Sequence, residues 1–166
     1  MQYAALVTWV VTAALGFYML VTWASQGGVR SGSGTASHFR PPVVFGHFLL
    51  AAAGLVVWLV YLVNDSTGLA WIAFVDLLVD AGIGDTLVYR WYRDRNAGAE
   101  TSGTGGGRRA SSAGRTSGGT MTDPATGGGV GLAEQRIPPA AVAAHGVFAV
   151  LTVVLVLLTA LGVGGS

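Results

Sequence analysis

The stretch at residues 40–63 reads RPPVVFGHFLLAAAGLVVWLVYLV and indicates how this chain folds. It opens with an arginine and two prolines, followed by an apolar run long enough to cross a bilayer, which takes about 20 residues. A similar stretch, RIPPAAVAAHGVFAVLTVVLVLL, occupies residues 136–158. Each stretch carries one histidine, His47 or His145, shortly after its prolines. The architecture and the first functional hypothesis both follow from this pair.

The composition indicates a membrane protein. Of the 166 residues, 52% are hydrophobic and only 10% are charged, whereas about a quarter of the residues in ordinary soluble domains are charged. Apolar segments of membrane length cover residues 3–24, 43–63, 69–89 and 140–162. We therefore expect an all-α, integral membrane four-helix bundle, multi-pass in the cell (cytoplasmic) membrane. The first segment lacks the basic region and cleavage site of a signal peptide, so we expect it to be retained.

The arginines predict the orientation. All 9 basic residues are arginine, and they lie in or beside the connections between the first and second segments and between the third and fourth. By the positive-inside rule these connections are cytoplasmic, and both termini lie outside. Residues 96–135 are rich in Gly, Ser and Thr, so we expect a disordered cytoplasmic linker there.

The two halves of the chain show a weak internal similarity. Each half has a span, a Gly/Ser-rich loop, an arginine, a proline pair and a second span with a histidine. Aligning His47 with His145, and Ala14 with Ala81, brings a few further identities into register. The halves would then be two parallel two-helix repeats related by an axis along the membrane normal. That relation places the two histidines at the same depth.

Two histidines at equal depth on parallel helices suit a b-type haem held by axial nitrogen ligands. Each lies roughly 8–9 Å along its helix from the proline pair, inside the hydrocarbon. Arg40 and Arg136 would lie near the cytoplasmic edge, where guanidinium groups pair with haem propionates. The chain has no cysteine, which excludes thiolate metal sites and covalent haem attachment. The alternatives are histidines that only hydrogen-bond a neighbouring helix, or that bind another metal.

In its four spans and two histidines the chain resembles the four-helix membrane cytochromes b. It is also similar to small four-span bacterial membrane proteins of unassigned function, a likeness that implies location only. The first resemblance implies bis-histidine haem b, electron transfer or an anchor role, and a membrane redox partner. The chain departs from the diheme members, which need four ligands, because its third histidine, His38, lies in a loop. One haem is therefore the maximum unless Met19 is recruited.

The third segment carries Asp76, Asp80 and Asp85 where hydrocarbon is expected. A carboxylate at mid-membrane costs about 2.5–3.5 kcal/mol on insertion scales, which makes each a functional hypothesis. Asp76 and Asp80 share a helix face, whereas Asp85 points roughly the opposite way. The first two would repel each other if both were ionised, so we expect at least one to be protonated.

Three interpretations of these aspartates stay open. They form a proton or cation path with the histidines, which in so small a chain would need a homodimer. They hydrogen-bond hydroxyls and lock the bundle. Or Asp85 is interfacial, with Arg90 as a distant partner. The hydroxyls in question are those of Thr8, Thr12 and Thr152.

Enzymatic motifs are absent from the sequence. There is no nucleophile elbow and no H-E-x-x-H, and the spans offer essentially no serine for an intramembrane protease. A net charge of +1, with arginines in a connection without aromatics, argues against nucleic-acid binding. We expect no independent catalytic activity. The sequence leaves an electron-transfer or anchor subunit, a proton- or cation-coupled transport element, and a non-catalytic accessory protein as hypotheses.

Overall fold

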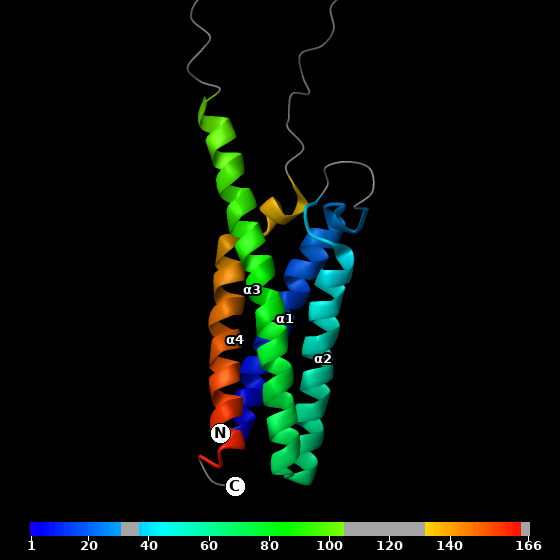
Figure 1. Ribbon diagram of the computed structural model, residues 1–166, viewed down its shortest axis with the longest axis vertical. Coiled ribbons are helices and arrows are strands. Elements are labelled where there is room, and N and C mark those ends of the chain that lie inside the picture. Colours follow the sequence, from blue (N-terminus) through cyan, green and yellow to red (C-terminus); the bar gives the residue numbers. More distant parts are fainter. Residues whose placement is uncertain (31–36, 105–131, 164–166) are drawn as a thin grey trace, which may run out of the picture.

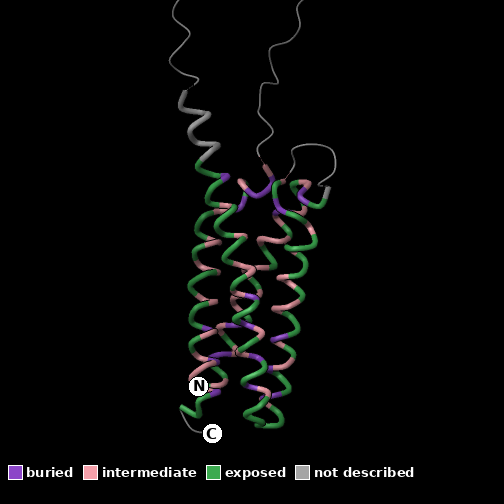
Figure 2. The backbone as a smooth tube through the Cα atoms, viewed as in Figure 1, coloured by how far each residue is buried: buried purple, intermediate pink, exposed green. Residues whose placement is uncertain are grey.

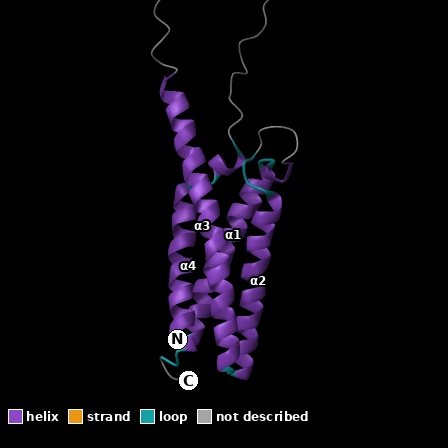
Figure 3. Cartoon of the chain, viewed as in Figure 1, coloured by secondary structure: helices purple, strands orange, loops and turns teal. Residues whose placement is uncertain are grey.

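The structure is a computed structural model that describes residues 1–30, 37–104 and 132–163. In this part of the chain four α-helices run alternately up and down: α1 (Gln2–Ser25), α2 (Pro41–Asn64), α3 (Thr67–Thr104) and α4 (Pro139–Ala160). Two short 3-10 helices, η1 (Gly28–Arg30) and η2 (Ala133–Arg136), lie in the connections. The start of α1 and the end of α4 lie at one end of the bundle, called the terminal end, and η1 and η2 lie at the other, called the connection end (Figure 1). Helices and short loops make up the whole of the described part, which has no strand (Figure 3).

All four helices are long and apolar enough to cross a membrane, which confirms the four predicted segments. Their most apolar windows have mean hydropathies of 2.0, 2.3, 1.5 and 2.6 in chain order. The outer surface is apolar as well, because large side chains such as Leu49, Val63 and Val150 are mostly exposed. A soluble monomer rarely exposes so much contiguous apolar surface, whereas a helix in lipid does. The described part thus has the lengths and surface of a multi-pass membrane protein.

Prolines set the starts of α2 and α4. α2 begins at Pro41 after an extended Arg40, and α4 begins at Pro139 after an extended Pro138. A proline is tolerated there because the first N–H groups of a helix have no intrahelical partner. At the other end of the bundle, Asp65 adopts the left-handed conformation (φ 50°) and ends α2 in a tight turn into α3.

The packing order places α2 and α4 on a diagonal of the bundle. α1 packs mainly on α4 and also on α2, while α3 packs on α2 and α4. α2 and α4 both run from the connection end towards the terminal end (Figure 1). A side chain that points inwards from α2 therefore meets one from α4 at the bundle axis.

The buried apolar side chains form two clusters separated along the axis. Figure 2 shows buried positions in the lower part of the bundle and again at the connection end. The terminal-end cluster comprises Ala5, Trp9, Trp58, Tyr61, Ala70, Ala73, Leu77, Val156 and Ala160. The connection-end cluster comprises Trp23, Phe39, Ala133 and Ile137. A group of polar side chains lies between the two clusters.

Helical structure extends into both ends of the predicted linker, residues 96–135. α3 continues to Thr104, because extending an existing helix by one residue needs no new nucleation. Near the other end η2 forms, and its Glu134 is fully buried. Composition alone could not reveal this, since Glu134 accepts a hydrogen bond from the backbone N–H of His38, far away in the sequence. Residues 105–131 of the predicted linker lie outside the described residues.

Gly54 is the tightest helix contact that a substitution can test. A Cβ at Gly54 would overlap the Asp76 carboxyl group and press on Trp9, whereas a Cβ at Gly46 would meet nothing within 4 Å. We predict that Gly54→Ala lowers the free energy of unfolding by about 1–3 kcal/mol, as overpacking does. Gly46→Ala is the matched control and should change it little. Thermal or denaturant unfolding in detergent measures both; equal effects would contradict the packing described.

Candidate functional site: a polar layer across the bundle

His47 and His145 meet at the bundle axis. Each lies six residues after the first residue of its helix, Pro41 or Pro139, so both sit at the same level. Their ring centroids are 6.4 Å apart and the rings are inclined at 71°, an edge-to-face arrangement. The structure therefore brings together the two histidines that the sequence placed at equal depth.

Each ring rests on a helix of the other half of the chain. His145 Nδ1 lies 2.9 Å from the carbonyl oxygen of Thr12 on α1. Because a carbonyl only accepts, this nitrogen carries the proton. His47 Nδ1 lies 2.8 Å from Asp80 Oδ1 on α3. That approach has the distance of an ion pair but not the alignment of a hydrogen bond, and both atoms are buried.

Two glycines let the rings lie against helix backbone. A Cβ at Gly16 would come within 3.1 Å of His145 Cε1, and a Cβ at Gly84 within 3.2 Å of His47 Cε1. The Nδ1–Cε1 edge of His145 and the Cε1–Nε2 edge of His47 thus lie on the neighbouring helix, at positions where a larger residue would push the rings away. Small residues at such points allow helices and rings to approach closely.

The layer has the approximate two-fold symmetry that a duplication would produce. Thr12 and Asp80 contact the Nδ1 atoms of the two rings, and the rings lie against Gly16 and Gly84. Gly16 follows Thr12 at the same interval along the helix as Gly84 follows Asp80. The sequence alignment of the first and third spans, which paired Ala14 with Ala81, is out of register with these contacts by one position. It relied on apolar identities, which are frequent in any span, whereas the contacts to the histidines identify the equivalent positions directly.

Asp76 extends the polar layer towards the terminal end. It lies one turn from Asp80 on α3, in a niche formed by Gly54 of α2 and by Trp9 of α1. Its Oδ2 is buried and has no hydrogen-bond partner among the described residues. Such an atom is unusual, since most buried polar atoms are paired.

The predicted hydroxyl lock is not formed by the threonines proposed for it. The Thr8, Thr12 and Thr152 hydroxyls donate to carbonyl oxygens of their own helices. In the described part of the chain, none of them bonds an aspartate.

The remaining predicted residues lie away from the layer. Asp85 is exposed on α3, as its angular position predicted, and no ion pair joins it to Arg90 within the described ranges. Arg40 and Arg136 are exposed, at the N-terminus of α2 and at the end of η2. They lie at the connection end, about two helical turns from the rings of His47 and His145.

The layer offers two imidazole nitrogens to a ligand. Both Nδ1 atoms are turned towards α1 or α3, and no described residue hydrogen-bonds either Nε2. With its proton on Nδ1, a neutral His145 presents a lone pair at Nε2, which can bind a metal or accept a proton. Metal-binding histidines characteristically have their second nitrogen held by a carboxylate or a carbonyl; the Thr12 carbonyl does this for His145, and the Asp80 carboxylate lies within 2.8 Å of His47 Nδ1.

Fold and site together define an all-helical, four-helix bundle of membrane-spanning length with a buried histidine–carboxylate layer. No protein-family model, no curated protein and no solved structure matches the chain. The arguments about function below therefore rest on the residues and their geometry.

The contact between His47 and Asp80 can be measured by a double-mutant cycle. Asp80→Asn and His47→Leu should each destabilise the bundle, and the double variant should lose less than the sum by about 0.5–3 kcal/mol. The control cycle pairs His47→Leu with Asp85→Asn, whose exposed carboxylate should add independently. Unfolding in detergent provides all the values. Additivity in the first cycle would show that the contact contributes no energy.

Proposed function

We propose that the protein binds one b-type haem between His47 and His145 and acts as an electron-transfer protein, or as the membrane anchor of a redox complex, in the cell membrane. The observation that carries this proposal is the meeting of two imidazoles from diagonal helices, each held at Nδ1. The partners it implies are the lipid bilayer and a membrane redox protein.

The donor set suits six-coordinate iron. Haem iron in cytochromes takes side-chain ligands on its two faces. Two imidazoles bonded to one metal at about 2 Å each would place their ring centres roughly 6 Å apart. The observed separation of 6.4 Å between the His47 and His145 rings is close to that value. The Thr12 carbonyl and the Asp80 carboxylate supply the second-nitrogen contacts that orient metal-bound histidines.

Small residues near the histidines favour a broad, flat ligand. A macrocycle is much wider than two imidazoles, so its edges must reach between neighbouring helices. Gly46 and Gly146 are next to the histidines in sequence, and Gly82 is near the same level on α3. All three are exposed on the outer face of the bundle, where a Cβ would meet nothing within 4 Å, so they would leave space where the edge of a macrocycle emerges between helices. Arg40 and Arg136, exposed at the connection end, would pair with the propionates.

The chain's own residues would hold and tune the group. A bound haem supplies a one-electron redox centre. Thr12 and Asp80 lie against the Nδ1 atoms of the rings, so that Nε2 is the nitrogen that each ring would offer to the iron. A carboxyl group beside His47, where His145 has a neutral carbonyl, would make His47 the stronger electron donor of the two. The apolar clusters on both sides of the layer exclude water from it.

A spectrum tests the proposal. After expression with ample haem, we expect the purified protein to show a reduced-minus-oxidised Soret and α-band difference with one haem per chain. His47→Ala and His145→Ala should each abolish it, because removing either axial ligand breaks the bis-histidine set. His38→Ala is the control and should keep the full spectrum. Absence of these bands in the wild-type protein would refute haem binding.

One observation favours a second candidate, a proton- or cation-coupled transport element. The buried Oδ2 of Asp76 has no described partner. Asp80 lies one helical turn further along α3, next to His47, and the His47 ring faces that of His145. A carboxyl group without a partner in an apolar interior holds a proton more readily than a charge. These four side chains would relay a proton over part of the membrane, and a homodimer would complete the path.

Flux into vesicles tests this second candidate. We expect reconstituted protein to carry a flux driven by a pH gradient. In Asp76→Asn the flux should fall at least about tenfold, because an amide cannot take up and release the proton; a tenfold loss corresponds to about 1.4 kcal/mol in the activation free energy. Asp85→Asn removes an exposed carboxylate of the same helix and should leave the flux unchanged. A wild-type protein without flux, or an undiminished flux in Asp76→Asn, would count decisively against transport.

A further inference from the structure

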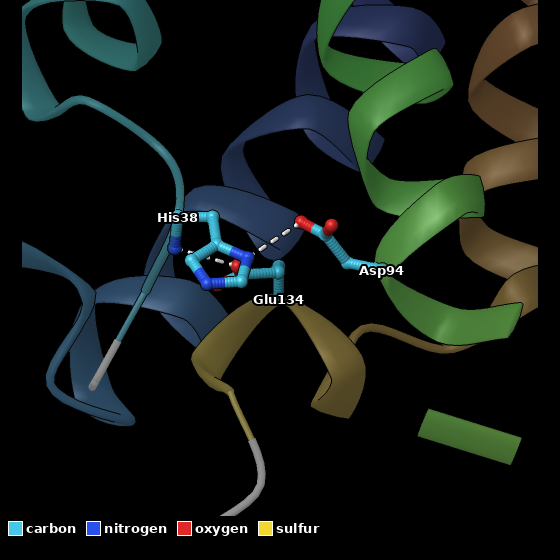
Figure 4. A group of neighbouring side chains, drawn as sticks. All are labelled: His38, Asp94 and Glu134. Atoms are coloured by element: carbon cyan, nitrogen blue, oxygen red, sulfur yellow. Dashed lines mark hydrogen bonds and ion pairs between the residues drawn. The ribbon is translucent and has the colours of Figure 1, made fainter. Parts of the chain in front are cut away.

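A second group of ionisable side chains lies at the connection end, outside the polar layer. It consists of His38, just before α2, Asp94 in the part of α3 at this end, and Glu134 in η2. One ligand atom from each lies within 4.8 Å of the others. Figure 4 shows both carboxylates pointing towards the same imidazole, Asp94 from α3 and Glu134 from η2. Along α3, Asp94 lies roughly 20 Å beyond Asp80 of the polar layer.

Existing contacts hold the three side chains in place. The backbone N–H of His38 donates to Glu134 Oε1 at 2.7 Å, and His38 Nδ1 lies 3.0 Å from Asp94 Oδ2. The side-chain amide of Gln135 donates to the backbone carbonyl of Asp94 at 3.1 Å. Three segments far apart in sequence are thereby brought to one point before any ligand is considered.

The group has more buried negative charge than its described surroundings compensate. Glu134 is 0% exposed, and its Oε2 has no partner among the described residues. Asp94 is 7% exposed, and its Oδ1 contacts the largely exposed guanidinium group of Arg93. A buried carboxylate oxygen without a donor is costly unless a cation neutralises it. Among the described residues, Arg93 compensates one carboxylate, and Glu134 has a backbone N–H as its hydrogen-bond donor.

We propose that His38, Asp94 and Glu134 bind a first-row divalent cation of the zinc class. One imidazole nitrogen and two carboxylate oxygens form a mixed donor set that suits Zn²⁺ and its neighbours. Mg²⁺ and Ca²⁺ prefer six or more oxygen ligands, which these residues do not supply. Zinc bonds of about 2.0–2.2 Å require donor atoms roughly 3.3–3.5 Å apart, so the side chains close by about 1 Å. The His38 side chain is 57% exposed, which leaves the solvent side open for water as a further ligand.

The bound ion joins the start of α2, the connection-end part of α3 and the entry into α4. These segments surround the connection-end cluster, where Phe39 and Ala133 are the sequence neighbours of His38 and Glu134. The ion therefore acts as a structural clamp at this end of the bundle. Its site shares no residue with the polar layer, so it stands or falls independently of haem binding and of transport.

Metal titration of the full-length protein tests the proposal. After treatment with a chelator, the detergent-solubilised protein is titrated with ZnCl2 by calorimetry, and its melting temperature is measured with and without the ion. We expect one Zn²⁺ per chain and a rise in melting temperature of roughly 5 °C, because an ion that binds only the folded state stabilises it. MgCl2 at the same concentration should produce neither effect.

Variants assign the ion to these residues. Glu134→Gln keeps the side-chain size and an acceptor for the His38 N–H but removes the charge, and it should weaken zinc binding at least tenfold. His38→Ala, which changes an exposed side chain, should do the same and serves if the first variant fails to fold. Asp65→Asn, at the opposite end of the bundle, is the control and should bind like the wild type. Wild-type protein without zinc binding, or binding lost in His47→Ala but kept in His38→Ala, would overturn the proposal.

Discussion

A polar hydrogen in the middle of an apolar bundle has no water to bond, so it must find an acceptor on another helix. His145 finds the carbonyl oxygen of Thr12, and His47 approaches the carboxylate of Asp80. Because each ring also needs a glycine on the same helix to lie against, these contacts set how far α4 is shifted along α1, and α2 along α3. A shift by a single position would bring a side chain against the ring. The two apolar clusters then pack above and below a layer whose position is already determined.

The layer is nearly symmetric in shape and asymmetric in chemistry. The half of the chain that contains α1 offers a neutral carbonyl to the histidine of α4, and the half that contains α3 offers a carboxylate to the histidine of α2. In the register that pairs Thr12 with Asp80, Thr8 corresponds to Asp76. Both acidic residues thus occupy positions at which the first half has threonine. The two histidines thus lie in equivalent contacts but differ in their surroundings, because only His47 has a carboxyl group beside it.

Much of the frame was predictable from the sequence, because it depends on local signals. Apolar run lengths gave the four spans, and the prolines gave the starts of α2 and α4 to within a residue or two. The equal depth of His47 and His145 followed from their similar spacing to those prolines. The partners of polar groups were not predictable, since which helix a ring rests on depends on the packing order. Thr12 illustrates the difficulty: its backbone oxygen holds His145, and its side chain, which drew notice in the sequence, bonds its own helix.

The contacts of the carboxylates at the connection end could not be predicted from the sequence either, because they also depend on how distant segments pack. A Gly- and Ser-rich composition indicates that a segment has little apolar surface to bury, but a single charged residue at its edge can still be held by one distant contact. Glu134 has such a contact with the backbone N–H of His38, and Asp94 has another with the imidazole of His38. Neither carboxylate belongs to a recognisable motif, because a long stretch of chain separates each member of the group from the next in sequence. Helices that pack through their apolar faces can bring such isolated side chains together at their ends. A hydrated metal ion can reach these ends, and charged side chains are not penalised there as they are within the apolar spans.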